Sequence, residues 1–245
     1  MHLNHVFVGP ASTTLIVFLH EGLGSIPQWK SYPVDLCNAL NVRGLVYDRT
    51  GYGRSSGSLA DRKPNYLHQA ANELSQIIES IKADFDQIIL YGHSDGGSIA
   101  LIAAAELKNQ ITALITEAAH VFVEPETIKG VREARPLFHE GLFDGLKKYH
   151  GDRYKEVFFA WNDIWLTPAF AEWDITHLLS KVHCPQLIIQ GKDDQYGTLK
   201  QVDTIARFTK GKTQTLVLDQ CGHAPHKEQK SSILTSAVSF IESIC

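Results

Sequence analysis

The sequence predicts an α/β protein with a mostly parallel central sheet of about seven strands, helices on both faces and an inserted helical cap. Two observations carry this prediction. Short apolar runs alternate with longer segments of helical periodicity along most of the 245 residues, which is the pattern of consecutive strand and helix units. The apolar runs show no alternation with polar residues, as expected for strands that are covered on both faces.

The predicted strands are short runs rich in Leu, Ile and Val. In chain order they cover residues 15–19, 45–47, 88–91, 111–115, 187–189 and 216–218. Residues 6–8 are a candidate for an antiparallel strand at the edge of the sheet.

Three segments carry the helices predicted for the core. Apolar residues recur at helical spacing over residues 67–81 and 233–244, as on one face of an amphipathic helix. Residues 98–107 are apolar nearly all round, so this helix should be the most buried.

The alternation of strands and helices stops after Val123. Residues 124–182 show helical patterns over 126–138, 140–149, 154–165 and 170–179, without a convincing strand. A strand pattern resumes at Cys184. We therefore expect residues 1–123 and 183–245 to form one core domain, with residues 124–182 inserted in it as a helical cap, or lid.

Charge and hydropathy limit the classes of partner. A net charge of −4 at pH 7 gives no support for binding to nucleic acid or to an anionic membrane. The first apolar run is too short for a secretory signal, and nothing approaches the roughly 20 apolar residues of a membrane span. We expect a cytoplasmic monomer or homodimer that acts on a small-molecule substrate.

The cysteines predict neither a disulfide framework nor a metal site. Four of them are scattered without C-x-x-C spacing, at Cys37, Cys184, Cys221 and Cys245, and a disulfide framework is improbable in a chain of this length and compartment. Cys221 with His223 and His226 fits no common zinc spacing, and the ligand count is short. We therefore predict no metal and no cofactor.

Gly92-His93-Ser94-Asp95-Gly96 is the most informative local pattern, because it stands between a predicted strand and a predicted helix. A strand that runs into Gly-x-Ser-x-Gly and then a helix is a nucleophile elbow, a turn so sharp that small residues must flank the serine. The helix start offers backbone N–H groups and a partial positive charge to an anion that forms there. Ser94 is therefore the predicted nucleophile.

A serine hydroxyl needs a base to take its proton and an acid to orient that base. Two polar loops follow later strands, at the carboxyl ends where parallel sheets place their sites. The loop at 191–195 contains Asp193 and Asp194, and periodicity does not choose between them. The loop at 219–226 contains His223, the predicted base. His226 competes with it, but we expect His226 in the first turn of the last helix, pointing elsewhere.

The oxygen that becomes negative when serine attacks a carbonyl needs two hydrogen-bond donors. The backbone N–H of Asp95, directly after the nucleophile, is one of them. The second should come from the loop after the first central strand. That loop reads His20-Glu21-Gly22-Leu23-Gly24-Ser25, and Gly22 is the predicted donor.

Taken together, these motifs resemble the α/β-hydrolase family with a helical cap, over essentially the whole chain. The loop from His20 to Gly24 resembles the family's His-Gly-x-x-Gly oxyanion loop, with Glu21 in place of the usual glycine. Residues 48–55 resemble its D-x-R-G-x-G-x-S turn, here D-R-x-G-x-G-x-S, and residues 221–223 its histidine loop. The resemblance implies that Asp194 is the catalytic acid and that Glu21 brings a carboxylate near the site.

Within this family, Gly92 to Gly97 and the apolar helix that follows resemble the valacyclovir hydrolase (biphenyl hydrolase-like) branch. An aspartate directly after the nucleophile recognises a substrate amino group there, which implies such a role for Asp95. The alternative role of Asp95 is to favour the helix N-terminus electrostatically. In the cap, Trp161 and Trp165, with Phe158 and Phe159, are candidates to line an apolar substrate pocket.

We therefore expect a serine hydrolase that cleaves a small carboxylic ester, or a related acyl substrate, through Ser94, His223 and Asp194 and an acyl-enzyme intermediate. Thioesters, lactones and carbon–carbon bonds of diketones suit the same triad. A carbon–carbon bond hydrolase or lyase, or a synthase, is thus an alternative. A catalytically silent ligand-binding module is less favoured, because a receptor has no need to retain all three residues.

Overall fold

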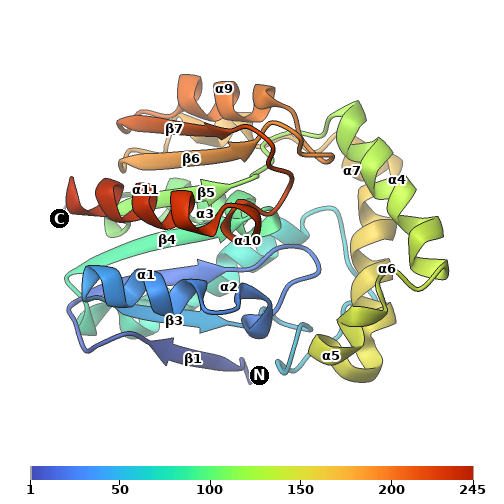
Figure 1. Ribbon diagram of the computed structural model, residues 1–245, viewed down its shortest axis with the longest axis horizontal. Coiled ribbons are helices and arrows are strands. Elements are labelled where there is room, and N and C mark those ends of the chain that lie inside the picture. Colours follow the sequence, from blue (N-terminus) through green and yellow to red (C-terminus); the bar gives the residue numbers. More distant parts are fainter. Residues whose placement is uncertain (1, 245) are drawn as a thin grey trace.

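The computed structural model describes residues 2–244, which fold around one seven-stranded sheet (Figure 1). Its strands are β1 (His5–Val8), β2 (Thr14–Leu19), β3 (Arg43–Tyr47), β4 (Gln87–His93), β5 (Ala113–Glu117), β6 (Gln186–Gly191) and β7 (Thr213–Leu218). Their order across the sheet is β1-β3-β2-β4-β5-β6-β7, and only β1 is antiparallel to its neighbour. The predicted parallel sheet and its antiparallel edge strand are both confirmed.

The α-helices of the described residues are α1 (Tyr32–Leu40), α2 (Tyr66–Ile81), α3 (Asp95–Leu107), α4 (Pro125–His139), α5 (Lys147–His150), α6 (Tyr154–Trp165), α7 (Pro168–Ala171), α8 (Thr176–Leu179), α9 (Leu199–Phe208), α10 (Pro225–Glu228) and α11 (Lys230–Glu242). Helices α1 and α11 pack on one face of the sheet, whereas α2, α3 and α9 pack on the other. No helix within residues 2–244 has the length and apolar character that a membrane span requires.

Each central strand contributes to two cores. In β2, Leu15 and Val17 belong to the core on the α2 and α3 side, while Ile16 and Phe18 belong to the core beneath α1 and α11. Burial on both faces is the physical reason why the apolar runs do not alternate. Helix α3 is buried from Asp95 through Ala105, as its uniformly apolar sequence predicts.

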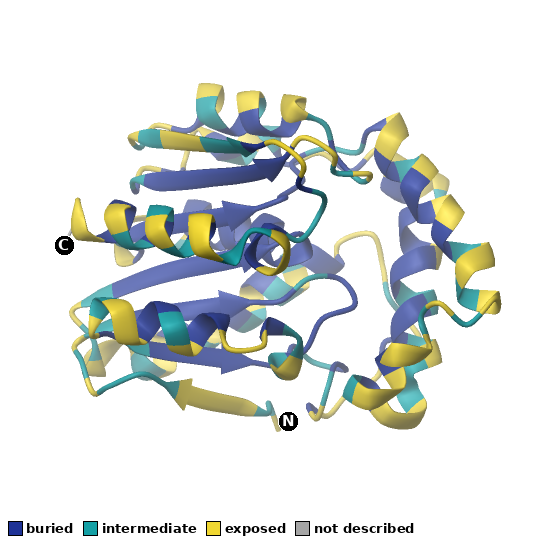
Figure 2. Ribbon diagram, in the orientation of Figure 1, coloured by how far each residue is buried: buried dark blue, intermediate teal, exposed yellow. Residues whose placement is uncertain are grey.

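The helices α4 to α8, which we call the helical insertion, lie between β5 and β6 in the chain. Helices α4 to α6 lie beyond the carboxyl ends of the parallel strands (Figure 1), whereas α8 packs against α3 and α9. The insertion has an aromatic core of its own, in which the rings of Phe138 and Phe158 stack at 4.1 Å. Figure 2 shows buried residues on the side of α4 and α6 that faces the sheet and exposed residues on the outer side. The insertion therefore covers the sheet edge at which the predicted site residues lie.

Two segments of the insertion differ from the prediction. Residues 140–149 do not form one helix, because α4 ends at His139 and Gly141 adopts a positive φ of 86° before the chain restarts as α5. Residues 170–179 are likewise divided into α7 and α8. Residues 172–175 run beside the core instead, where the Ile175 N–H donates to the Val121 carbonyl at 2.8 Å.

The strand predicted at 111–115 is displaced by two residues. Strand β5 begins at Ala113 and continues through Thr116 to Glu117. Both of these polar residues are fully buried, and their polarity hid the end of the strand from the apolar pattern.

The elbow glycines allow a backbone approach that no side chain would permit. A Cβ on Gly96 would lie 1.9 Å from the Leu19 carbonyl oxygen, at the point where α3 passes the end of β2. We expect Gly96→Ala to lower the free energy of unfolding by about 3 kcal/mol through this overlap, measured by urea denaturation. Gly145→Ala, which meets no heavy atom within 4 Å, is the control and should stay within about 1 kcal/mol of wild type. Equal stability of the two variants would contradict the close approach.

Candidate active site

Ser94 occupies the turn between β4 and α3 in a strained backbone conformation. Its φ of 54° and ψ of −119° lie outside the regions that non-glycine residues favour, and such strain persists only where the surroundings enforce it. The Ser94 N–H donates to the Glu117 carbonyl at 2.8 Å, and the N–H groups of Gly97 and Ser98 donate to the Ser94 carbonyl. These bonds hold the turn in the geometry of a nucleophile elbow.

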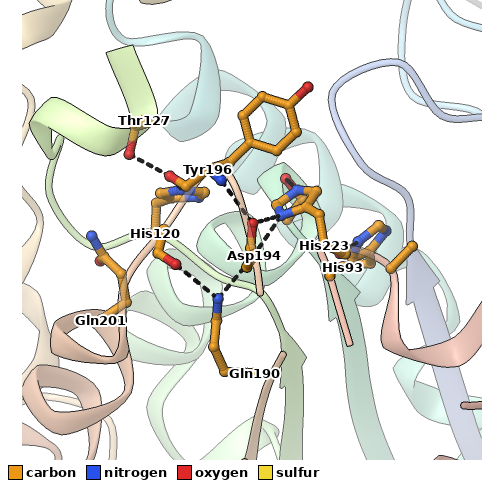
Figure 3. A network of polar contacts seen from close by, with 12 residues as sticks. His93, His120, Thr127, Gln190, Asp194, Tyr196, Gln201 and His223 are labelled. Carbon is orange, nitrogen blue, oxygen red and sulfur yellow. Dashed lines mark hydrogen bonds and ion pairs between the residues drawn. The ribbon is translucent and has the colours of Figure 1, made fainter. Parts of the chain in front are cut away.

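The structure brings Ser94, His223 and Asp194 together, from three loops that are far apart in the sequence. His223 Nε2 lies 2.8 Å from Ser94 Oγ. His223 Nδ1 lies 2.8 and 2.9 Å from the two Asp194 carboxylate oxygens (Figure 3). A carboxylate can only accept, so Nδ1 carries the proton and donates it to Asp194. The Nε2 lone pair is thereby left to accept the Ser94 hydroxyl proton.

Asp194 is held by two further donors. Gln190 Nε2 donates to its Oδ2 at 2.7 Å and the Tyr196 N–H to its Oδ1 at 2.8 Å (Figure 3). Burial by itself would raise the pKa of Asp194, but the positive charge of His223 and the hydrogen bonds from His223 and the Tyr196 N–H outweigh burial and hold the pKa below its ordinary value. Asp193 is exposed. The structure thus settles, in geometry, which of the two aspartates meets His223.

The environment of His223 favours its protonated form. Burial by itself would lower the pKa of His223, but the Asp194 carboxylate outweighs burial and raises that pKa above the ordinary value. The Tyr196 ring packs against the imidazole with centroids 4.8 Å apart. An imidazole that gains a proton easily in this position is suited to act as a general base towards Ser94.

The loop from His20 to Gly24 is held in place by hydrogen bonds that its carbonyl groups accept. The Arg49 N–H donates to His20 Nε2 at 3.1 Å, so His20 Nδ1 carries the proton and donates to the Glu21 carbonyl at 2.8 Å. Arg49 Nη2 donates to the same carbonyl at 2.8 Å, and the Tyr52 hydroxyl donates to the Gly22 carbonyl at 3.0 Å. With these carbonyls engaged on one side, the peptide plane of Gly22 is oriented before any substrate arrives.

The helical insertion supports this loop through His150. The Gly53 N–H donates to His150 Nδ1 at 3.0 Å, and His150 Nε2 donates to the Leu23 carbonyl at 2.9 Å. Burial lowers the pKa of His150, which keeps the ring neutral and able to accept on one side while it donates on the other. One histidine of the insertion therefore links the loop from His20 to Gly24 to the turn that follows β3.

The Asp95 carboxylate is engaged inside the protein. The Tyr66 hydroxyl lies 3.0 Å from both of its oxygens, Arg49 Nη2 lies 3.5 Å away, and the side chain is buried. Trp165 Nε1 donates to the Tyr66 hydroxyl at 2.9 Å. The substrate contact expected for Asp95 stays a prediction, and a substrate amine would have to compete with Arg49 and Tyr66 for it.

A cavity of about 60 Å³ opens onto Ser94 and His223. Its remaining lining residues are Glu21, Gly22, Leu23, His120, Thr127, Val131, Trp161, Trp165 and Tyr196. The expected positions of Glu21, Trp161 and Trp165 near the site agree with this lining. Phe158 and Phe159, expected in the pocket, do not line it. Phe158 is wholly buried in the aromatic core of the insertion instead.

Three polar lining residues, His120, Thr127 and Tyr196, were not foreseen. Figure 3 shows that the Tyr196 carbonyl accepts hydrogen bonds from His120 Nε2, at 2.8 Å, and from the Thr127 hydroxyl. His120 follows the carboxyl end of β5, so its place in the topology was a usable signal. Tyr196 has the same signal, because it follows the carboxyl end of β6 in the loop that carries Asp194. Thr127 has none, because it reaches the cavity only through the packing of α4 on the core.

A larger cavity of about 370 Å³ lies between α2 and residues 49–62. It contains no member of the triad, and its lining includes Arg49, Arg62, Tyr66 and Glu73. Size alone therefore does not mark the site. The convergence of Ser94 and His223 does.

His226 does not compete with His223. It lies in α10, a short helix of its own rather than the first turn of the last helix, and its Nδ1 is 2.6 Å from Glu117 Oε2. Among the described residues, His93, Glu117 and His226 are the one group whose metal-ligating atoms lie within 4.8 Å of one another. Cys221, which we considered as a ligand with His223 and His226, is not part of that group.

Comparison with known proteins identifies the family of this chain. A family model described as "Alpha/beta hydrolase family" matches residues 16–230. The human protein named serine hydrolase BPHL is 28% identical over 173 residues, which cover 68% of this chain and 58% of the human protein. The chain is thus aligned with less than two thirds of that relative. A proline iminopeptidase of Saccharolobus solfataricus is 24% identical over 270 residues, covering 94% of this chain and 85% of the relative.

Solved structures agree on the fold. A thermophilic esterase from Thermogutta terrifontis superposes with a TM-score of 0.73 at 19% identity, over 99% of this chain and 93% of the esterase. The enol-lactonase from Burkholderia xenovorans gives a TM-score of 0.73 at 20% identity, over 98% and 96% of the two chains. At this identity the likeness concerns the fold, not the substrate.

Proposed function

The chain belongs to the alpha/beta hydrolase family, and we propose that it is a serine hydrolase that cleaves a small carboxylic ester through an acyl-enzyme on Ser94. One observation carries the proposal. Ser94 Oγ, the His223 ring and the Asp194 carboxylate form one hydrogen-bonded line, with contacts of 2.8 Å at each end of the imidazole. This is the arrangement that turns a weak hydroxyl into a nucleophile.

In the proposed reaction, Ser94 Oγ bonds to the carbonyl carbon of the ester while its proton passes to His223 Nε2. Asp194 stabilises the imidazolium that results and keeps Nδ1 protonated. Collapse of the tetrahedral intermediate expels the alcohol, which takes the proton from Nε2. Water then repeats the sequence on the acyl-enzyme, which releases the carboxylic acid and restores Ser94.

The negative oxygen of each tetrahedral intermediate needs donors that are already in place. We assign this role to the backbone N–H groups of Gly22 and Asp95. Asp95 is the first residue of α3, so its N–H stands at the positive end of that helix. A Cβ on Gly22 would lie 2.6 Å from the Trp161 ring, so only glycine lets the loop pass between that ring and the site.

The cavity supports a substrate with a short acyl group. Its volume of about 60 Å³ is room for only a few water molecules, and Trp161 and Trp165 wall it on the insertion side. Among the described residues that line it, Glu21 is the one carboxylate, and there is no lysine or arginine. An anionic acyl group is therefore disfavoured.

Hydrolysis of p-nitrophenyl esters from acetate to decanoate tests the proposal, with alanine p-nitroanilide as the amide counterpart. We expect turnover that is highest for acetate or butyrate and falls steeply with longer chains, because the cavity does not admit them. Cleavage of the anilide alone would replace the esterase by a peptidase. A wild-type protein that is inert towards every ester while a phosphonate still labels Ser94 would favour the carbon–carbon or synthase alternative.

A further inference from the structure

Beside the triad lies a buried polar cluster that the proposed reaction does not use. It consists of His93, Glu117 and His226, each at most 3% exposed, together with the Tyr91 hydroxyl. The His93 ring lies between the other two imidazoles, with centroids 5.3 Å from His223 and 4.9 Å from His226. Buried polar groups of this kind are costly unless they are hydrogen-bonded or paired.

Glu117 accepts hydrogen bonds from the segment that carries Ser94 and from the segment that follows His223. Its main-chain carbonyl accepts the Ser94 N–H at 2.8 Å. Its side-chain Oε2 accepts His226 Nδ1–H at 2.6 Å and the His226 main-chain N–H at 3.3 Å. A single residue at the end of β5 thus holds the backbone of the nucleophile and a point three residues beyond the base.

His93 makes a second link between the same two segments. It directly precedes Ser94, pairs with Glu117 across β4 and β5, and donates from Nε2 to the His223 carbonyl at 2.7 Å. Burial lowers the pKa of His93, so the ring remains a neutral donor. The main chain of the base is therefore tied to the strand that carries the nucleophile.

The carboxylate of Glu117 is itself locked in orientation. The Tyr91 hydroxyl donates to its Oε1, and the Tyr32 hydroxyl lies 2.9 Å behind that of Tyr91. The Trp29 ring packs on His226 with centroids 4.7 Å apart. The cluster offers ligand atoms within 4.8 Å of one another, but both Glu117 carboxylate oxygens, His93 Nε2 and His226 Nδ1 already have hydrogen-bond partners in the protein.

We propose that Glu117 is a positioning residue, which acts through His226 to keep His223 Nε2 at hydrogen-bond distance from Ser94 Oγ. The inference rests on the proposed function. The histidine loop carries the base on a segment without regular secondary structure between β7 and α10, so its placement depends on such links. A displacement of about 1 Å at a reacting group can cost about 100-fold in rate.

A double-mutant cycle tests the inference on the best ester substrate. Glu117→Ala and His226→Ala are each expected to lower kcat by about 30- to 100-fold with KM within about threefold of wild type. Because both changes break the same link, the loss of kcat in the double variant should be no greater than the loss in the less active single variant. Glu117→Gln should recover kcat to within about fivefold of wild type, since its amide oxygen still accepts from His226 and the Tyr91 hydroxyl can turn to accept from the amide N–H.

Glu73→Ala provides the matched control. It removes another glutamate, which is half-buried and accepts a hydrogen bond from the Thr50 N–H on the α2 side of the core, and it should keep the wild-type kcat. Should Glu117→Ala fail to fold, Glu117→Asp carries the same prediction, because it keeps the charge but withdraws the carboxylate by one methylene.

Losses that multiply in the double variant, or a wild-type kcat in folded Glu117→Ala, would overturn the positioning role while leaving the hydrolase standing. A wild-type protein that neither cleaves esters nor takes up a phosphonate on Ser94 would instead refute the proposed function. We also expect EDTA to leave the wild-type kcat unchanged. Loss of activity in EDTA that Zn²⁺ restores would indicate that the cluster binds a metal, and this result would also overturn the inference.

Discussion

Ser94→Ala is expected to lower kcat on the best p-nitrophenyl ester by about 10⁴-fold or more, because no acyl-enzyme can form. The hydroxyl is the only part of the side chain that the change removes, and the turn around it is held by main-chain bonds to Glu117 and from Gly97 and Ser98. Folding should therefore be preserved. Initial rates at saturating substrate measure the effect.

Ser75→Ala is the control for this prediction. The Ser75 hydroxyl donates to the Ala71 carbonyl on α2, and its loss should leave kcat unchanged. Ser94→Ala free of contaminating wild-type protein could keep more than a few per cent of the wild-type rate only if a water molecule attacked the ester directly. That result would contradict the serine nucleophile.

Asp194→Asn is expected to lower kcat by about 10⁴-fold, because an amide no longer enforces the tautomer that leaves His223 Nε2 free to accept a proton. Asp193→Asn is the matched change one residue earlier, in an exposed side chain, and should retain wild-type kcat. The comparison is read from kcat and KM on the same ester. Equal losses in both variants would contradict the assignment of Asp194 as the orienting acid.

The pH dependence supplies an independent readout of the same contact. The base must be neutral, so kcat/KM should fall as the pH drops through the pKa of His223, which Asp194 raises above its ordinary value. Removing the Asp194 charge lowers that pKa, so the acid limb of the residual activity in Asp194→Asn should move to lower pH. An acid limb that stays in place would mean that another group titrates.

Features that depend on local sequence were predictable here. The elbow needs glycines on both sides of Ser94, and the acid and the base each follow an apolar run, so a strand-by-strand interpretation placed all three at one sheet edge. The choice between Asp193 and Asp194 was of a different kind. Neighbouring residues share every local signal, and only the packed loop shows that Asp194 receives the Gln190 and Tyr196 donors while Asp193 faces solvent.

Features that depend on distant partners were out of reach. The carboxylate of Glu117 at the end of β5 is buried because it pairs with His226. The two residues are 109 positions apart in the sequence, so no local pattern indicates the pair. The division of residues 170–179 has a similar cause, since the main chain there bonds to Val121. The contact of Thr127 with the cavity likewise follows from how the insertion packs on the core.

The central claim is that Ser94 is a nucleophile activated by His223. Intact-protein mass spectrometry after treatment with a fluorophosphonate tests it most directly, because the reagent needs the same activated hydroxyl and no knowledge of the natural substrate. We predict one adduct per wild-type molecule, located by peptide mapping to Ser94, and none in folded Ser94→Ala or His223→Ala over the same time. An adduct at another residue, or none on the folded wild-type protein, would contradict the account.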